Sequence, residues 1–401
     1  MKAETEETQN HHEHHHQQHG HSSFDARSVQ PVSDMSSADI SKFMAGSQKG
    51  KAQPLKGFDA DYTDIVDYIV RSTHKIWEEK GIGLIYTHYR HNVLIHTSDG
   101  MTYGRDKVIA DSIKTMAAFP DVRLYADDVI WSGNDEDGFH SSHRIVWVGH
   151  NTGYSVYGPP TGRKVVRRGI AHCFVKENRI IEEWISRDEL ALVRQLGFNE
   201  FDLARKHAAQ DAAKGLKGPE SRAHGEVERL WGQSPPEWME PKQGDSFDVE
   251  DFVQRSIHEI WNWRLLGRVG LYYSRNYLCH TSTNRTLYGL GDFKANILAL
   301  LAAFPDAAMR VDHICWLGND EEGYRVATRW TLQGTHDGPG MYGDPTGQRV
   351  TLMGITHQVI KDGKFIKEWT AFDEFALLKQ LYWPKDEYEM ERALGRSGLP
   401  L

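Results

Sequence analysis

The chain has 401 residues, a formal net charge of −9 and 39% hydrophobic residues, with 12 Trp and 16 Tyr. This length and composition predict two to three globular domains with aromatic cores or pockets. The negative charge argues against nucleic-acid binding, which needs a basic face, and no apolar run approaches the roughly 20 residues that span a bilayer.

The three cysteines, Cys173, Cys279 and Cys315, have unrelated spacings that fit neither a disulfide framework nor a zinc knuckle. We expect them to be reduced and mostly buried. The acidic start of the chain has no apolar stretch and is no secretory signal. A soluble, cytoplasmic protein is therefore expected.

Residues 1–58 are rich in His, Gln, Ser, Lys and Gly and are predicted to form a disordered tail. Deleting them should then leave the stability unchanged. Seven histidines crowd near the start of this tail and form what we call the His-rich tail: His11, His12, His14, His15, His16, His19 and His21. Two interpretations remain open, a divalent transition-metal binder and a passive polar tail or tag.

Helical periodicity follows at about 65–77 and again from Asp106 to Phe119. The pattern then changes to period two. Strands are predicted at 122–131, 139–149, 164–176 and 179–187. Helices followed by long antiparallel strands indicate an α+β fold.

The second half repeats the first. Residues 64–97 align with 248–281 at an offset of 184, and after Thr286 the offset is 185. So long a period indicates whole domains, because solenoid repeats run at about 20–50 residues. We predict a first domain at 59–200 and a second at 247–390. Between them lies a linker at 201–246 that begins as a helix, Leu203–Lys214.

Several motifs recur between the copies. The first copy carries G-x-x-T-G at 149–153, G-x-P-T-G at 158–162, E-W-x-x-x-D at 183–188 and a closing L-x-x-Q-L-G; the second carries G-T-H-D-G at 334–338, D-P-T-G at 344–347, K-D-G-K at 361–364 and E-W-x-x-x-D at 368–373. With these motifs the chain resembles, in two tandem copies, the SnoaL-like polyketide cyclase (ester cyclase) family of the nuclear-transport-factor-2-like superfamily.

The resemblance implies two cone-shaped domains, each a bent antiparallel sheet wrapped against N-terminal helices around a mostly apolar pocket. It also implies cofactor-free acid/base chemistry by a buried Asp and a nearby His. Many relatives carry an acidic residue directly after the Trp of the E-x-W element, whereas this chain has Ile185 and Thr370. That departure leaves polyketide ring closure itself open.

Polar residues kept in both copies are the catalytic candidates. His172 and His357 alternate with apolar neighbours, so each is either a cavity-lining general base or a core histidine bonded to the backbone. Asp188 and Asp373 end the last strand beside a Trp, and each is either an acid or orienting group of raised pKa or a helix N-cap.

Arg144 and Arg329 lie in mid-strand, where a buried guanidinium needs a substrate anion or a carboxylate of the same copy, such as Asp127 or Asp312, as its partner. His96 and His280 occur in matching contexts and are predicted to provide a second hydrogen-bonding group. Six aromatic residues are predicted to line the substrate pocket or the domain interface: Trp131, Tyr157, Trp184, Trp316, Tyr342 and Trp369.

The leading hypothesis is a cofactor-independent acid/base enzyme, a cyclase, isomerase, dehydratase or lyase acting on a small oxygenated organic molecule. The alternatives are a non-catalytic ligand-binding or scaffold protein and a metal-assisted lyase or hydrolase in the same cone. We expect the domains to pack as an internal pseudo-dimer with Trp147 and Trp330 between the sheets, and further homo-oligomerisation is left open. We also expect His172→Ala to be more damaging than His357→Ala.

Overall fold

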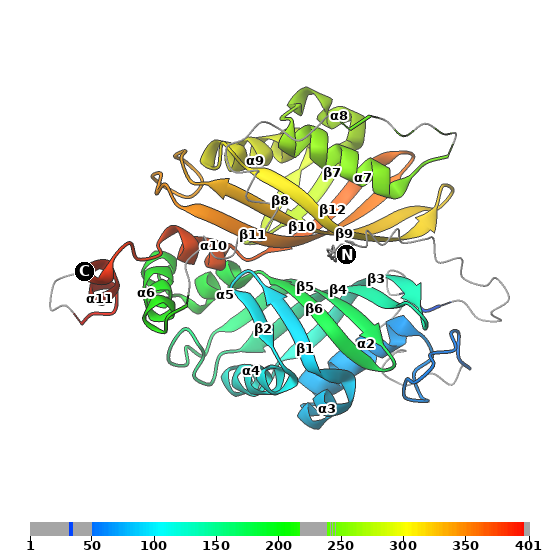
Figure 1. The fold of residues 1–401 in the computed structure, drawn as a ribbon, viewed down its shortest axis with the longest axis horizontal. Helices are drawn as coiled ribbons and strands as arrows, with labels where there is room; N and C mark the ends of the chain where they lie inside the picture. Colours follow the sequence, from blue (N-terminus) through cyan, green and yellow to red (C-terminus); the bar gives the residue numbers. More distant parts are fainter. Residues whose placement is uncertain are drawn as a thin grey trace, which may run out of the picture.

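The computed structural model describes residues 32–34, 50–216, 239–240, 242, 244 and 246–396. It contains two α+β units, each with N-terminal helices followed by a six-stranded sheet. The sheets face each other in the middle of the molecule, with α2–α4 and α7–α9 on the outer sides (Figure 1). None of the helices described is long and apolar enough to cross a membrane.

The first unit begins with a helix that Asp64 caps by accepting a hydrogen bond from the Asp67 amide. Its elements are α2 (Ile65–Thr73), η1 (His74–Glu78), η2 (Ile82–Leu84), α3 (Ile85–His88), β1 (Tyr89–Thr97), β2 (Gly100–Tyr103), α4 (Arg105–Ala118), β3 (Arg123–Asn134), β4 (Gly138–His150), β5 (Lys164–Lys176), β6 (Arg179–Arg187), α5 (Glu189–Leu196) and α6 (Glu200–Ala213). The four predicted strands are confirmed, with ends shifted by at most three residues.

The second unit repeats this order. Its elements are α7 (Val249–Ile257), η5 (His258–Asn262), η6 (Leu266–Arg268), α8 (Val269–Tyr272), β7 (Tyr273–Thr281), β8 (Arg285–Tyr288), α9 (Gly289–Ala303), β9 (Ala308–Asn319), β10 (Gly323–Thr335), β11 (Arg349–Lys361), β12 (Lys364–Phe372), α10 (Glu374–Leu381) and α11 (Glu387–Ala393). The α+β class and the duplication are confirmed.

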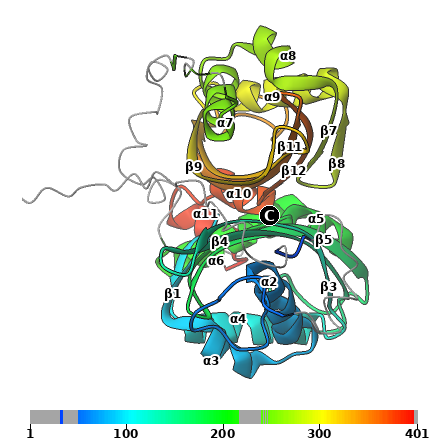
Figure 2. The ribbon, with the colours of Figure 1, turned by 90° about the vertical axis from the view of Figure 1, so that its right-hand side faces the viewer.

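Both sheets are mixed rather than wholly antiparallel. The strand orders are β2-β1-β6-β5-β4-β3 and β8-β7-β12-β11-β10-β9. The β1–β6 and β7–β12 pairs are parallel, and four further strands lie between the members of each pair along the chain. Each sheet curves strongly around its own helices without closing into a barrel (Figure 2).

Alternation along each strand separates two environments. We call each curved sheet together with the helices that it wraps a cone, the first formed by β1–β6 and the second by β7–β12. On β4, His143, Ile145 and Trp147 line the inside of the first cone. Ser142 and Arg144 point outward, to the second sheet, where they contact His357. Successive side chains of a strand point to opposite faces, so even-numbered β4 residues face the interface and odd-numbered ones face the cone.

Reciprocal contacts join the two sheets. The Arg144 guanidinium lies 3.7 Å from the ring centre of Trp369, and that of Arg329 lies 3.9 Å from the ring centre of Trp184. An apolar cluster of Ile170, Ile355 and Ala371 completes the centre. Close guanidinium–indole contacts of this kind stabilise a desolvated interface by about 2 kcal/mol each.

The expected position of Trp147 and Trp330 between the sheets is wrong. Trp147 packs edge-on against Phe119 in the first cone, and Trp330 packs in the core of the second. A β-bulge at Asp127 in β3, and another at Asp312 in β9, shifts the pairing with the neighbouring strand. Which face of a strand is buried in the cone could not be chosen from alternation alone, since both faces are covered.

The prediction that all of residues 1–58 form a separate tail is wrong for its last part. Leu55 is only 1% exposed and belongs to the first core with Phe58. The Gln53 side chain accepts a hydrogen bond from the Ile65 amide, and Ser33 donates to Asp64. The few apolar residues of this segment thus suffice to join the core. The His-rich tail lies outside the described residues.

The predicted linker also contains packed structure. Helix α6 buries Leu203, Ala204 and Ala208 and packs against α10 and α11 of the second unit. Lys379 of α10 forms an ion pair with Asp211 of α6 at 2.8 Å. The start of the linker is therefore a helix that packs against both units. Residues 217–238 lie outside the described residues.

Candidate functional site

The two cones hold cavities of very different size. The first encloses about 410 Å³, whereas the second retains about 80 Å³. Small-molecule sites usually occupy about 300–1,000 Å³. Of these two cavities, which the described residues line, that of the first cone therefore has room for an organic ligand and that of the second does not.

Substitutions between the copies explain the difference in volume. Val108, Ile145 and Arg187 line the first cavity, and the corresponding positions of the second are Phe293, Trp330 and Phe372. The Trp330 ring lies against Gly354, where an added Cβ would come within 2.0 Å of it. Aromatic rings thus fill the second cone.

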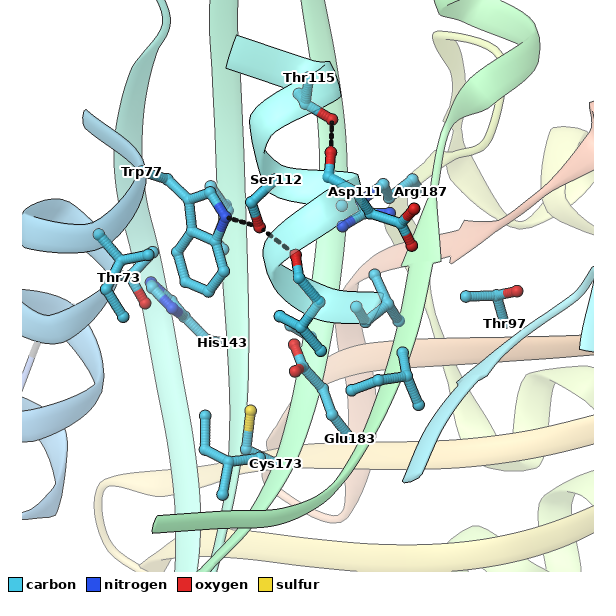
Figure 3. Close-up of a pocket in the computed structure, with 18 of the residues that line it drawn as sticks. Thr73, Trp77, Thr97, Asp111, Ser112, Thr115, His143, Cys173, Glu183 and Arg187 are labelled. Carbon is cyan, nitrogen blue, oxygen red and sulfur yellow. Dashed lines mark hydrogen bonds between the residues drawn. The ribbon is translucent and has the colours of Figure 1, made fainter. Parts of the chain in front are cut away.

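Glu183 is the central ionisable group of the first cavity. It projects from β6 into the cavity (Figure 3) and accepts a hydrogen bond from the Tyr89 hydroxyl at 3.1 Å. Burial raises the pKa of Glu183 to about 7, although the Arg187 charge and the Tyr89 hydroxyl act in the opposite direction. A carboxyl group with this pKa can both take and give a proton near neutral pH.

Arg187 supplies positive charge to the same cavity. It lies four residues after Glu183, two repeats of the strand period, and therefore on the same face of β6. Its side chain is accessible from the cavity, while the surrounding protein lowers its pKa through desolvation. No hydrogen bond ties its guanidinium to another residue in the described part of the chain, so it can bind an anionic oxygen.

His143 adds a neutral imidazole. It is buried on β4, and burial lowers its pKa to about 3, so the ring is uncharged at neutral pH. Its Nε2 has no hydrogen-bond partner among the described residues. A buried polar atom without a partner is costly, and a ligand oxygen in the cavity would satisfy it.

The opposite wall comes from helices. The Trp77 indole donates a hydrogen bond to the Ser112 hydroxyl at 3.0 Å, which joins η1 to α4 (Figure 3). Asp111 and Thr115 lie on the same helix beside the cavity. This wall therefore combines the flat indole ring of Trp77 with a few hydroxyl and carboxylate groups, a combination that suits small polar organic ligands.

Glu368, which corresponds to Glu183, has a different environment. It accepts hydrogen bonds from the Tyr277 hydroxyl at 2.6 Å, the Thr370 hydroxyl at 2.7 Å, the Cys279 thiol at 3.1 Å and the Gln358 side-chain amide at 3.4 Å. These four donors replace the open cavity that Glu183 faces. Glu368 is therefore a satisfied structural carboxylate.

The predicted catalytic histidines and arginines do not line either cavity. His172, His357, Arg144 and Arg329 all lie between the two sheets. Burial lowers the pKa of both histidines well below the usual value. They were kept in both copies because both halves use them in the same interface.

Asp188 and Asp373 are helix N-caps, the alternative that the sequence left open. Each accepts a hydrogen bond from the amide three residues later, in α5 and α10. Asp188 also accepts one from the Thr283 amide of the second unit at 2.8 Å. Burial raises the pKa of Asp188 to about 6, but the carboxylate serves the cap and the interface rather than the first cavity.

The remaining candidates also lie away from the cavities. His96 stacks on Trp184, and His280 stacks on Trp369, between the sheets. Trp131 and Tyr342 pack in the cores, Tyr157 donates to Glu189, and Trp316 packs against Tyr324. None of the six predicted aromatic residues lines the cavity of either cone, so the pocket alternative is wrong. The interface alternative holds for Trp184, Trp369 and Tyr157, which contact the other unit. The three cysteines are free and buried, as predicted.

Sequence reasoning missed Glu183, Arg187 and His143 as site residues. The second copy has Phe372 and Thr328 at the positions of Arg187 and His143, so a filter for residues kept in both copies rejects them. Glu183 passed the filter but was treated as part of a motif. A search for polar residues present in only one copy would have found two of the three.

Fold and site define a class of protein: two fused cone-shaped α+β domains, one of which holds a mostly apolar cavity of small-molecule size with a few polar groups. The family model for SnoaL-like polyketide cyclases matches residues 67–196 and 251–381. The chain belongs to this family and contains two copies of its domain. No curated protein matches the chain.

Solved structures of single-domain relatives are similar to about one third of the chain. A proposed SnoaL-like polyketide cyclase from Jannaschia sp. CCS1 is 20% identical and covers 35% of this chain and 99% of its own, with a TM-score of 0.31. IdmH, a proposed polyketide cyclase from Streptomyces antibioticus, is 22% identical over 33% and 96%, with a TM-score of 0.29. AclR, a proposed hydroxylase from Streptomyces galilaeus, is 26% identical over 33% and 93%, with a TM-score of 0.29.

Proposed function

We propose that the first cone is the active site of an acid/base enzyme that acts on a small oxygenated organic molecule. The observation that supports this most directly is Glu183, a cavity-facing carboxyl group whose pKa is raised to about 7. A general acid or base works best when its pKa lies near the working pH. Cyclisation, isomerisation, dehydration and C–C bond cleavage all use such a proton carrier.

The chemical step begins with the Glu183 carboxylate taking a proton from carbon next to a substrate carbonyl. The C–H electron pair forms a C=C bond while the π pair of the carbonyl moves to its oxygen, and the Arg187 guanidinium stabilises the resulting enolate. His143 provides a neutral hydrogen-bonding group for a second oxygen. Glu183 afterwards returns the proton, either to another carbon or to the alkoxide formed when the enolate carbon attacks a second carbonyl.

The second cone supports a structural role. Its cavity of about 80 Å³ is too small for such a substrate, and its matching carboxylate Glu368 is bonded to four donors. The second sheet contributes Trp369 and His357 to the interface behind the first one. This half therefore fits the non-catalytic scaffold alternative, while the first half fits the enzyme.

The test measures proton abstraction without knowledge of the product. A panel of cyclic and aromatic ketones is incubated with the protein in D₂O, and deuterium incorporation next to the carbonyl is followed by proton NMR. We expect Glu183→Gln to lower the protein-dependent exchange rate by about 10²–10⁴-fold, the usual contribution of a general base. Glu368→Gln is the matched control in the other cone and should leave the rate of the folded protein unchanged.

A ligand-binding protein without catalysis would behave differently. Compounds would then bind to the first cone, detected as broadened ligand resonances, yet exchange would stay at the solvent rate in wild type and variant alike. Equal losses in the Glu183→Gln and Glu368→Gln variants would also contradict the proposal, because they would point to general destabilisation.

A further inference from the structure

Three histidines from both halves of the chain meet between the sheets. His140 lies on β4, His172 on β5 and His313 on β9. One nitrogen of each ring lies within 4.8 Å of one nitrogen of each other ring. His172 is 1% exposed and His313 is 9% exposed, while His140 is half-buried at the edge of the cluster.

The geometry is close to that of three ligands around one ion. His140 Nδ1 and His172 Nε2 are 2.9 Å apart, and the His313 ring centre lies 4.2 Å and 4.8 Å from those of His140 and His172. Zinc–nitrogen bonds of about 2.0–2.1 Å in a tetrahedron place neighbouring nitrogens about 3.3 Å apart. Ring rotations that move the nitrogens by about 1 Å would therefore bring all three to a common centre.

The internal repeat places an equivalent cluster at the other end of the interface, and we call these two equivalent places its corners. The residues at the second corner can be compared with the three histidines. The positions that correspond to His140, His172 and His313 are Arg325, His357 and Asp128. There Arg325 forms an ion pair with Asp128 across the sheets, and His357 bonds to Ser142 and Arg144. At one corner an Arg–Asp ion pair thus links the two sheets. At the other corner three imidazoles occupy the equivalent positions.

The chemistry of the cluster selects the kind of ion. Burial and the neighbouring histidines keep His172 neutral, and the neutral imidazole is the form that binds metals. Arg329 adds positive charge near His172, and Asp312 and Glu182 counter it. Three nitrogen ligands without a carboxylate suit Zn²⁺, Co²⁺, Ni²⁺ or Cu²⁺ rather than Mg²⁺ or Ca²⁺.

We propose that His140, His172 and His313 form a transition-metal site that cross-links the two sheets, with water as the fourth ligand. The site lies outside the first cavity, so it is a structural clamp and not part of the proton-transfer chemistry. Its bound ion would take the structural place that the Arg325–Asp128 ion pair has at the other corner. The proposal is independent of the catalytic role of Glu183.

The experiment must first remove the competing His-rich tail. A full-length variant with all seven tail histidines replaced by Gln is stripped with chelator and titrated with Co²⁺, whose visible absorption reports tetrahedral coordination. We expect one Co²⁺ per chain, displaced by Zn²⁺, and a melting temperature that rises with added Zn²⁺, since an ion that binds only the folded state stabilises it.

The His140→Asn and His313→Asn substitutions, made separately in this background, should each weaken Co²⁺ binding by more than about 100-fold. Loss of a residue that only orients a metal ligand already costs about 10–100-fold, and loss of a ligand should cost more. His357→Asn, at the other corner, is the matched control and should leave binding unchanged. If a ligand variant does not fold, the parent protein still decides the matter. No tetrahedral cobalt spectrum in the parent, or equal binding by the His313→Asn and His357→Asn variants, would overturn the proposal.

Discussion

Replacing Glu183 by Gln should make the protein more stable above neutral pH. The ordinary glutamate pKa of 4.5 is raised to about 7 by burial in the folded protein. Between these values the unfolded chain releases the proton while the folded protein keeps it. The unfolded state then binds fewer protons, so stability falls as pH rises from about 4.5 to about 7 and stays lower above it.

The size of the effect follows from the pKa shift. A pKa difference of one between the folded and unfolded states changes the free energy of unfolding by about 1.4 kcal/mol. The raised pKa of Glu183 therefore lowers the free energy of unfolding by about 3 kcal/mol at pH 8. Gln has the same shape, does not ionise, and keeps an oxygen that can accept the Tyr89 hydrogen bond. The Glu183→Gln variant should therefore match wild type at pH 4.5 and exceed it by up to about 3 kcal/mol at pH 8.

Urea unfolding at pH 4.5 and pH 8, followed by circular dichroism and tryptophan fluorescence, measures this difference. The control is Glu368→Gln, which alters an acceptor of four hydrogen bonds and should destabilise the protein at both pH values. A Glu183→Gln variant that is equally stable or less stable than wild type at pH 8 would show that the carboxyl group is not held protonated by burial.

Two other substitutions test the cone and the N-terminal segment. Ile145→Trp, combined with Ala171→Thr, copies Trp330 and its partner Thr356 into the first cone, where Gly169 leaves the same space as Gly354. The double variant should fold but lose ligand binding, measured by NMR titration; unchanged affinity would show that ligands bind elsewhere. Leu55→Ala removes a fully buried side chain and should cost about 2–5 kcal/mol in urea unfolding. A loss below about 0.5 kcal/mol, as is usual for a surface position, would mean that the segment does not belong to the first core.

The fold could be predicted almost completely from the sequence. The change from helical to strand periodicity at Val122 and the repeat at an offset of 184 depend on local patterns that survive in each copy. The parallel pairing of β1 with β6 could not be predicted, since it joins strands about ninety residues apart. The packing of Leu55 was missed because one apolar residue in a polar segment has no periodicity.

The site was harder to predict than the fold, for a physical reason. Comparing the copies selects residues that both halves need, and both need the interface, which contains His172 and His357. The activity that we propose needs only one cone, so the residues that line its cavity could differ between the halves. Both faces of each sheet are covered, so alternation showed that His172 and His143 lie on opposite faces without showing which face is the cavity.

The covalent joining of the two halves has a consequence for what the interface can become. In a dimer of identical chains, every substitution at the contact appears twice, so an Arg at one corner forces an Arg at the other. Here Arg325 and Asp128 lie at one corner while His140 and His313 lie at the other. In a single chain, two geometrically equivalent places can therefore carry different residues and different chemistry. In the same way, one cone can keep an open cavity while aromatic side chains fill the other.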